Sequence, residues 1–138
     1  MMVNDRMPEY TVERAGKILN RYKKALNGSR VLVLGAAYKQ DIDDYRESPA
    51  VRVMGEFRKT GAEVSYYDPY VPKYRDNGVW YEGIPVLSPE AVRQYDLVCI
   101  ATAHTNVDYA MVCGCGVPVF DCKNVCKNIQ ERGNIELL

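Results

Sequence analysis

The chain of 138 residues lacks a net charge, a long apolar run and more than one histidine. Its 18 basic and 18 acidic residues cancel and no basic tract stands out, which argues against nucleic acid and an anionic membrane surface as partners. No apolar run approaches the roughly 20 residues of a membrane-spanning helix. Residues 1–10 also lack the apolar region of a signal peptide. We therefore expect a cytoplasmic protein with one domain's worth of chain.

Cysteine is present in an odd number, five, and without the regular spacing of a disulfide framework, which is typical of reduced intracellular thiols. Four of these thiols lie close together, at positions 113, 115, 122 and 126, and four thiols could bind zinc. Their spacing is CxC followed by CxxxC, which differs from the paired CxxC of most zinc ribbons. Small buried thiols without a metal are the favoured interpretation.

Apolar runs alternate with helical patterns along the chain. Buried strands are expected at 31–34, 63–67, 97–101 and 117–120, and helices at 49–59, 89–94 and 105–112. A serine followed by proline marks the start of two of these helices. Residues 70–87 are expected to form an irregular excursion with a short strand around Trp80. The alternation predicts an α/β fold, a Rossmann-like three-layer sandwich with a mainly parallel sheet.

An additional amphipathic helix is expected at 8–26, before the first strand. Because it continues no sheet pattern, we interpret residues 1–27 as a connector helix that enters from another domain. Residues 28–138 are then the Rossmann-like domain. A connector helix without its former neighbour would leave an apolar face open, and that face could mediate dimerisation.

The loop from Gly35 to Pro49 is the candidate site. It follows the first strand, and loops at the carboxyl ends of strands line the ligand crevice of an open α/β sheet. Lys39 and Arg46 lie in this loop, where an anionic ligand would bind. The alternative is a solvated loop in which neighbouring acidic residues neutralise both cations, since exposed ion pairs contribute only about 0 to 1 kcal/mol.

A dinucleotide fingerprint would place three glycines after the first strand, but only Gly35 is present. Phosphate would therefore be held by side chains, with Lys39 as a point charge and Arg46 as a planar fork. Asp68 ends the second strand, where an acid could hold a ribose hydroxyl, yet Asp-Pro is also an ordinary strand terminator. His104 has no evident partner, and a structural hydrogen-bonding role is as well supported as a functional one.

Four blocks of sequence carry a longer match. They are residues 31–49, with Tyr-Lys and Arg-Glu-Ser-Pro, then residues 66–70, with Tyr-Asp-Pro, then residues 100–104 and residues 120–124. In this order they resemble the C-terminal, UDP-binding domain of the UDP-glucose/GDP-mannose dehydrogenase family. The resemblance covers nearly the whole chain. It implies part of an NAD-dependent enzyme of polysaccharide biosynthesis that oxidises the C6 hydroxymethyl of a UDP-sugar to a carboxylate.

The resemblance also implies roles for particular residues. Tyr38 and Lys39 would line the nucleotide-sugar site, and Arg46 would reach the NAD that another domain binds. Lys123 would hold the nucleotide, at a position where the family usually has Arg, so a point charge replaces a planar fork.

The same resemblance shows what this chain does not contain. The family's N-terminal NAD-binding domain, its central helical domain and its catalytic cysteine all precede the matching region. We therefore expect no catalytic residue and no metal ligand here, an inactive chain on its own, and a homodimer at full length. The alternative is a non-catalytic nucleotide-sensing or metal-binding module with a Rossmann-like core.

Overall fold

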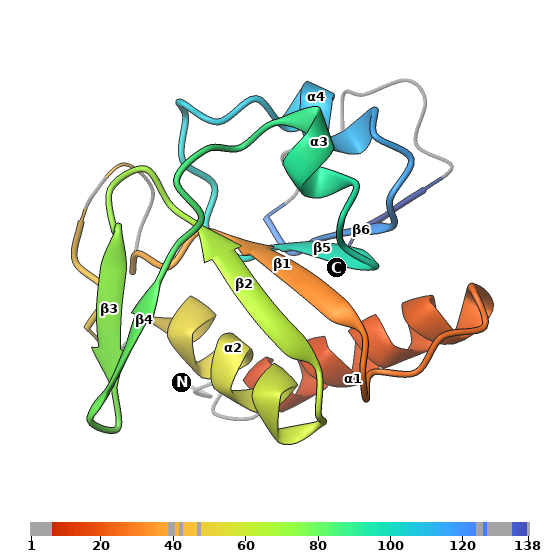
Figure 1. The fold of residues 1–138 in the computed structure, drawn as a ribbon, viewed down its shortest axis with the longest axis horizontal. Helices are drawn as coiled ribbons and strands as arrows, with labels where there is room; N and C mark the ends of the chain where they lie inside the picture. Colours follow the sequence, from red (N-terminus) through yellow and green to blue (C-terminus); the bar gives the residue numbers. More distant parts are fainter. Residues whose placement is uncertain are drawn as a thin grey trace, which may run out of the picture.

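A five-stranded parallel sheet forms the centre of the computed structural model, which describes residues 7–38, 41, 43–46, 48–123, 126 and 134–137. The strands are β1 (Arg30–Leu34), β2 (Glu63–Tyr67), β5 (Leu97–Ile100), β6 (Val119–Asp121) and β7 (Ile135–Leu137). Their order across the sheet is β2-β1-β5-β6-β7, and every pairing is parallel (Figure 1). The chain thus extends the sheet from β1 to β2 on one side, then crosses to β5 on the other.

Helices cover both faces of this sheet. Helices α1 (Met7–Arg21) and α2 (Pro49–Lys59) lie on one face, and α3 (Pro89–Val92) and α4 (Tyr109–Cys113) lie on the other (Figure 1). Residues of β1 alternate between the two sides, since Val31 and Val33 pack in the cluster with α1 and α2 while Leu32 and Leu34 pack with α3 and α4. The expected Rossmann-like three-layer sandwich is confirmed. Within the described residues, no helix is long and apolar enough to cross a membrane.

The excursion after β2 contains a hairpin, where the sequence predicted only a short strand. Strands β3 (Lys73–Asp76) and β4 (Val79–Glu82) pair antiparallel across Asn77 and Gly78, both with positive φ, as a two-residue hairpin turn requires. Tyr74 anchors the hairpin, because its buried ring lies 5.2 Å from the rings of both Tyr66 and Tyr81.

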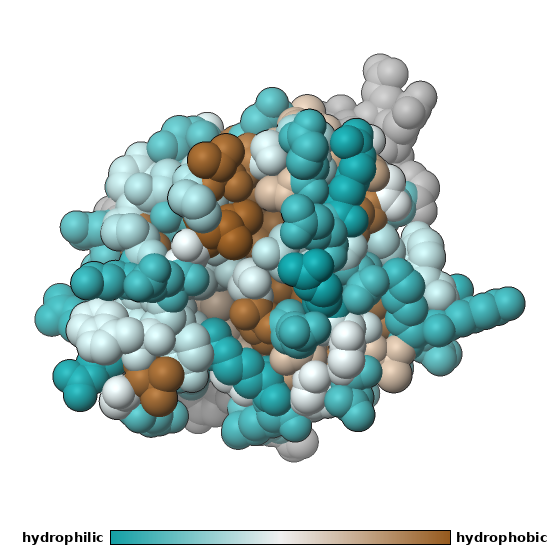
Figure 2. Space-filling model, viewed as in Figure 1, coloured by the Kyte–Doolittle hydropathy of each residue, from teal (hydrophilic) through white to brown (hydrophobic). Residues whose placement is uncertain are grey.

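The outer side of the hairpin faces solvent, unlike the side that carries the buried Tyr74, because Val79 and Trp80 are exposed. Figure 2 shows that apolar side chains on this face of the molecule form several separate patches among hydrophilic ones. The exposed apolar surface of this view is therefore scattered rather than continuous.

Several element boundaries differ from those predicted. The first helix ends at Arg21 instead of residue 26, because Lys23 has a φ of +62° and the chain leaves the helical path. The helix expected at 105–112 begins only at Tyr109, where the side chain of Asp108 caps it by accepting from the N–H of Met111. The fourth strand occupies 119–121 rather than 117–120. Strand β7 was not predicted.

The apolar face of α1 is covered within this domain. Val12, Ala15, Ile18 and Leu19 are buried in the cluster that also contains α2 and the sheet. This differs from the expectation that the face is open for dimerisation. The interpretation of residues 1–27 as a connector from another domain stays a prediction.

Candidate functional site

The carboxyl-terminal edge of the sheet, beside β1 and β5, is where the fold places a ligand. The strand order reverses at β1, and open α/β sheets bind ligands at such a switch point, outside the carboxyl ends of the strands. The loop that follows β1 contains Tyr38 and Arg46. The loop that follows β5, residues 101–108, lies beside it and is called the β5 loop below. Lys123 follows β6 at the same edge.

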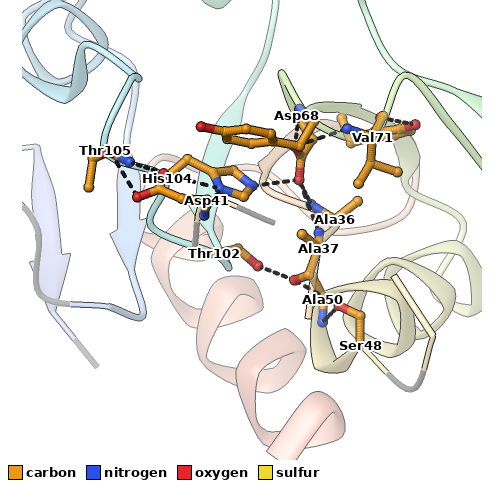
Figure 3. Close-up of polar contacts among 12 residues, drawn as sticks. Ala36, Ala37, Asp41, Ser48, Ala50, Asp68, Val71, Thr102, His104 and Thr105 are labelled. Carbon is orange, nitrogen blue, oxygen red and sulfur yellow. Dashed lines mark hydrogen bonds and ion pairs between the residues drawn. The ribbon is translucent and has the colours of Figure 1, made fainter. Parts of the chain in front are cut away.

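Asp68 is the hub that joins these loops (Figure 3). It directly follows β2 and is buried, and its Oδ2 accepts from the backbone N–H of Ala36 (2.7 Å) and Ala37 (3.0 Å). The same Oδ2 lies 2.8 Å from Nε2 of His104. Its Oδ1 accepts from two N–H groups of the turn after β2, at 2.8 and 3.2 Å. Because both oxygens are engaged, the structure favours an organising role for Asp68 over the ribose-holding role.

The backbone before Tyr38 is fixed from a second side as well. The carbonyl of Ala37 accepts from Oγ1 of Thr102 (2.8 Å) in the β5 loop and from Oγ of Ser48 (3.2 Å). Ser48 also caps α2, since its hydroxyl oxygen accepts from the N–H of Ala50. The start of the loop is therefore held by the ends of β2 and β5 and by the N-terminus of α2.

His104 is buried, with 1% of its surface exposed, and has partners on both ring nitrogens. Nδ1 accepts from the backbone N–H of Asp41 (2.7 Å), while Nε2 faces Asp68. The carboxylate of Asp41 in turn accepts from the N–H and hydroxyl of Thr105, each at 2.9 Å. The N–H of Thr105 is the main cause that lowers the pKa of Asp41.

Sequence reasoning gave neither Asp68 nor His104 a firm role. The one signal it offered was that each residue follows a buried strand, and that these strands are neighbours of β1.

Tyr38 and Arg46 lie in the loop as predicted, and both contact Asp44. The N–H of Tyr38 donates to the carbonyl of Asp44 (2.6 Å), and its side chain is exposed. Nε and Nη2 of Arg46 pair with the Asp44 carboxylate at 3.1 and 3.2 Å, which holds the pKa of Asp44 below its usual value. The Arg46 side chain is 84% exposed. Lys39 lies outside the described residues.

Lys123 lines a cavity of about 80 Å³ at the first turn of α2. Pro49 and Ala50 contribute one side of this cavity, and Ala101, after β5, contributes another. The backbone N–H of Lys123 donates to the Asp121 carboxylate (3.0 Å), which fixes the chain as it leaves β6. An ammonium group and the partial positive charge of a helix N-terminus both favour an anion.

Four of the five cysteines form two separate pairs. The sulfur atoms of Cys113 and Cys126 are 3.0 Å apart, and those of Cys99 and Cys122 are 4.0 Å apart. In the part of the chain that the structure describes, no three His, Cys, Asp or Glu side chains are grouped to hold a metal ion. Burial raises the pKa of the Cys113 and Cys126 thiols, so neither is an activated thiolate.

This arrangement predicts the reactivity of the thiols. The three buried ones, Cys99, Cys113 and Cys126, are expected to react with Ellman's reagent only when the domain unfolds, because they are protonated and shielded. The half-buried Cys115 and Cys122 should react first. A titration in buffer and in urea, with the modified residues identified by mass spectrometry, measures this order. Rapid modification of Cys113 in the native protein would contradict it.

Comparisons with known proteins agree on one family. The model of the UDP-glucose/GDP-mannose dehydrogenase family, UDP binding domain, matches residues 32–128. A UDP-N-acetyl-D-mannosamine dehydrogenase of Methanocaldococcus jannaschii is 36% identical over 103 residues, which are 74% of this chain and 21% of that protein. A UDP-N-acetyl-D-glucosamine 6-dehydrogenase of Pseudomonas aeruginosa is 26% identical over 104 residues, 75% of this chain and 24% of that protein.

Solved structures give the same result. The UDP-D-ManNAc dehydrogenase of Pyrococcus horikoshii superposes with a TM-score of 0.78 at 26% identity, covering 97% of this chain and 31% of that one. The UDP-N-acetyl-mannosamine dehydrogenase Cap5O of Staphylococcus aureus superposes with a TM-score of 0.71 at 31% identity, with the same coverage of 97% and 31%. The chain thus spans less than a third of the length of these relatives.

Proposed function

Since this chain belongs to the UDP-glucose/GDP-mannose dehydrogenase family, as its UDP-binding domain, we propose that it binds the nucleotide end of a UDP-sugar within a longer 6-dehydrogenase. That enzyme would oxidise the sugar C6 hydroxymethyl to a carboxylate with NAD as the hydride acceptor. NAD would be bound mainly by an N-terminal domain of the longer protein. The catalytic cysteine would also come from outside this chain, because four of the described thiols are buried or paired and that of Cys115 donates to the carbonyl of Met111.

The observation that carries this proposal is the position of Lys123. It lines a cavity together with the first turn of α2 and residues at the ends of β5 and β6, where a cation and a helix N-terminus both favour a phosphate. The cavity, about 80 Å³, is far smaller than the roughly 300 Å³ or more of a ligand pocket. It therefore suits part of a nucleotide sugar, and other domains would enclose the remainder.

The proposed role of Arg46 requires an exchange of partners. In this structure its guanidinium pairs with Asp44 at the surface, where solvent screens the attraction. A hydrogen bond to a phosphate of NAD is charge-assisted and contributes about 1.5 to 3 kcal/mol. A charge-assisted hydrogen bond would then replace a pair that solvent screens. Tyr38 and Lys39 are proposed to contact the sugar or phosphates of the substrate.

Calorimetric titration with UDP tests the proposal through Lys123→Gln. Loss of a charge-assisted contact of about 1.5 to 3 kcal/mol should weaken UDP binding by roughly tenfold to more than a hundredfold. Lys123→Arg should retain most of the affinity, since a planar fork also binds phosphate.

Lys17→Gln is the matched control. Lys17 is an exposed residue of α1 that pairs with Glu13, so its loss should leave the affinity unchanged. Equal affinities for Lys123→Gln and the parent chain would remove Lys123 from the site. No heat of binding with UDP at millimolar concentration would count against the domain as a nucleotide holder.

A further inference from the structure

His104 has the geometry of a residue that organises the loop from Gly35 to Pro49, called the ligand loop below. It is buried at the carboxyl end of β5, with a ring centroid 4.8 Å from that of Tyr70. One of its nitrogens faces Asp68, and the other faces the backbone of Asp41 (Figure 3). With both nitrogens engaged and the ring shielded, His104 has no free position from which to exchange a proton with a substrate.

The hydrogen bonds define the tautomer of this imidazole. The N–H of Asp41 is a donor and must meet a lone pair, so Nδ1 carries no proton. The proton of the neutral ring is then on Nε2, which donates to Oδ2 of Asp68. The ring therefore donates to the Asp68 carboxylate through Nε2 and accepts from the backbone of Asp41 through Nδ1.

The backbone conformation of Asp41 needs support from neighbouring groups such as His104. Its φ is +62°, in the left-handed region, which costs a residue other than glycine about 1 kcal/mol. Conformations of this kind persist where surrounding contacts hold them. Here the contacts come from the β5 loop, through His104 to the N–H of Asp41 and through Thr105 to its carboxylate.

The β5 loop thus hydrogen-bonds to the ligand loop at one residue before Tyr38 and Lys39 in the sequence and at one residue after them. On the N-terminal side, Thr102 donates to the carbonyl of Ala37. On the C-terminal side, His104 accepts from Asp41. Tyr38, which is proposed to contact the substrate, lies between these two anchors in the sequence.

We propose that His104 is a positioning residue that sets the backbone of the ligand loop at Asp41 for binding a nucleotide sugar, and that it does so as the Nε2–H tautomer. This role rests on the proposed function of the loop. It is expressed through affinity for the nucleotide and does not involve contact with the reacting atoms.

Nitrogen-15 NMR tests the tautomer without any ligand. His104 is the single histidine of the chain, so a histidine-labelled sample gives one imidazole. The expected spectrum has a protonated, pyrrole-type Nε2 and an unprotonated, pyridine-type Nδ1. A protonated Nδ1 would overturn the proposal, because such a nitrogen does not accept from Asp41.

Two amide variants separate positioning from stability. In His104→Gln the side-chain NH2 reaches the place of Nε2 and can still donate to Asp68, but the acceptor for Asp41 is lost. In His104→Asn the amide oxygen occupies the place of Nδ1 and retains that acceptor, but the donor to Asp68 is lost. We expect His104→Gln to speed hydrogen exchange of the Asp41 amide and to weaken UDP binding about five- to tenfold, and His104→Asn to change affinity less.

The outcomes distinguish the two proposals. If both variants lose UDP affinity only in proportion to their loss of stability, His104 is merely structural. If the parent chain binds UDP and both variants bind it equally well, positioning by His104 is wrong while the proposed function stands. If the parent chain does not bind UDP, the proposed function fails, and the imidazole spectrum and Asp41 exchange alone decide whether His104 orders the loop.

Discussion

Asp68→Asn is expected to lower the free energy of unfolding by about 2 to 6 kcal/mol. A carboxylate presents two acceptor oxygens, whereas an amide presents one oxygen and an NH2 group. In either orientation at least two N–H groups lose their bond to the Asp68 side chain and face the amide NH2 instead, at about 1 to 3 kcal/mol for each group. When the NH2 faces Val71, the N–H of Val71 keeps only its longer contact, 3.3 Å, with the Asp68 carbonyl. Urea unfolding followed by circular dichroism measures the loss.

Asp43→Asn provides the matched control for this experiment. Asp43 is an exposed carboxylate in the loop that follows β1, and its replacement should change the unfolding free energy by less than about 0.5 kcal/mol. If Asp68→Asn were as mild as Asp43→Asn, the carboxylate would not be the hub that the hydrogen bonds describe. A fall in the UDP affinity of Asp68→Asn is attributed to the loop only if it is larger than the fall measured for Asp43→Asn.

The sheet could be predicted from sequence because its signal is local and strong. Buried parallel strands are continuous apolar runs, and Ser-Pro marks the starts of α2 and α3. Strands β3 and β7 lacked that signal. They are strands of four and three residues, and β3 has the polar sequence KYRD, in which only Tyr74 is buried. Its stability comes from contacts with Tyr66 and Tyr81, which the sequence does not display.

The ligand loop could be located from sequence, but its support could not. Position after a strand and two cations indicated a site for an anion. The groups that hold the loop are backbone N–H and carbonyl groups, which every residue has and no pattern distinguishes. Asp68 and His104 are 36 positions apart, and only the order of β2, β1 and β5 brings them together. Topology, rather than local preference, makes them partners.

Gly35→Ala is expected to be the most disruptive conservative change at the switch point. Gly35 has a φ of +97°, and a Cβ built there would lie 2.4 Å from Cβ of Thr102 and 2.7 Å from its carbonyl oxygen. The left-handed conformation costs about 1 to 2 kcal/mol, and forcing extra atoms into packed structure costs about 1 to 3 kcal/mol. Thermal and urea unfolding should together show a loss of about 2 to 5 kcal/mol.

Gly55→Ala, the same substitution in the middle of α2, should have the opposite sign. No atom lies within 4 Å of a Cβ at that position, and alanine stabilises a helix interior by roughly 0.5 to 1 kcal/mol relative to glycine. A stable Gly35→Ala domain would mean that the ends of β1 and β5 can separate. Because Thr102 also holds Ala37, that separation would release the start of the ligand loop, so UDP affinity should fall even in the fraction of Gly35→Ala that remains folded.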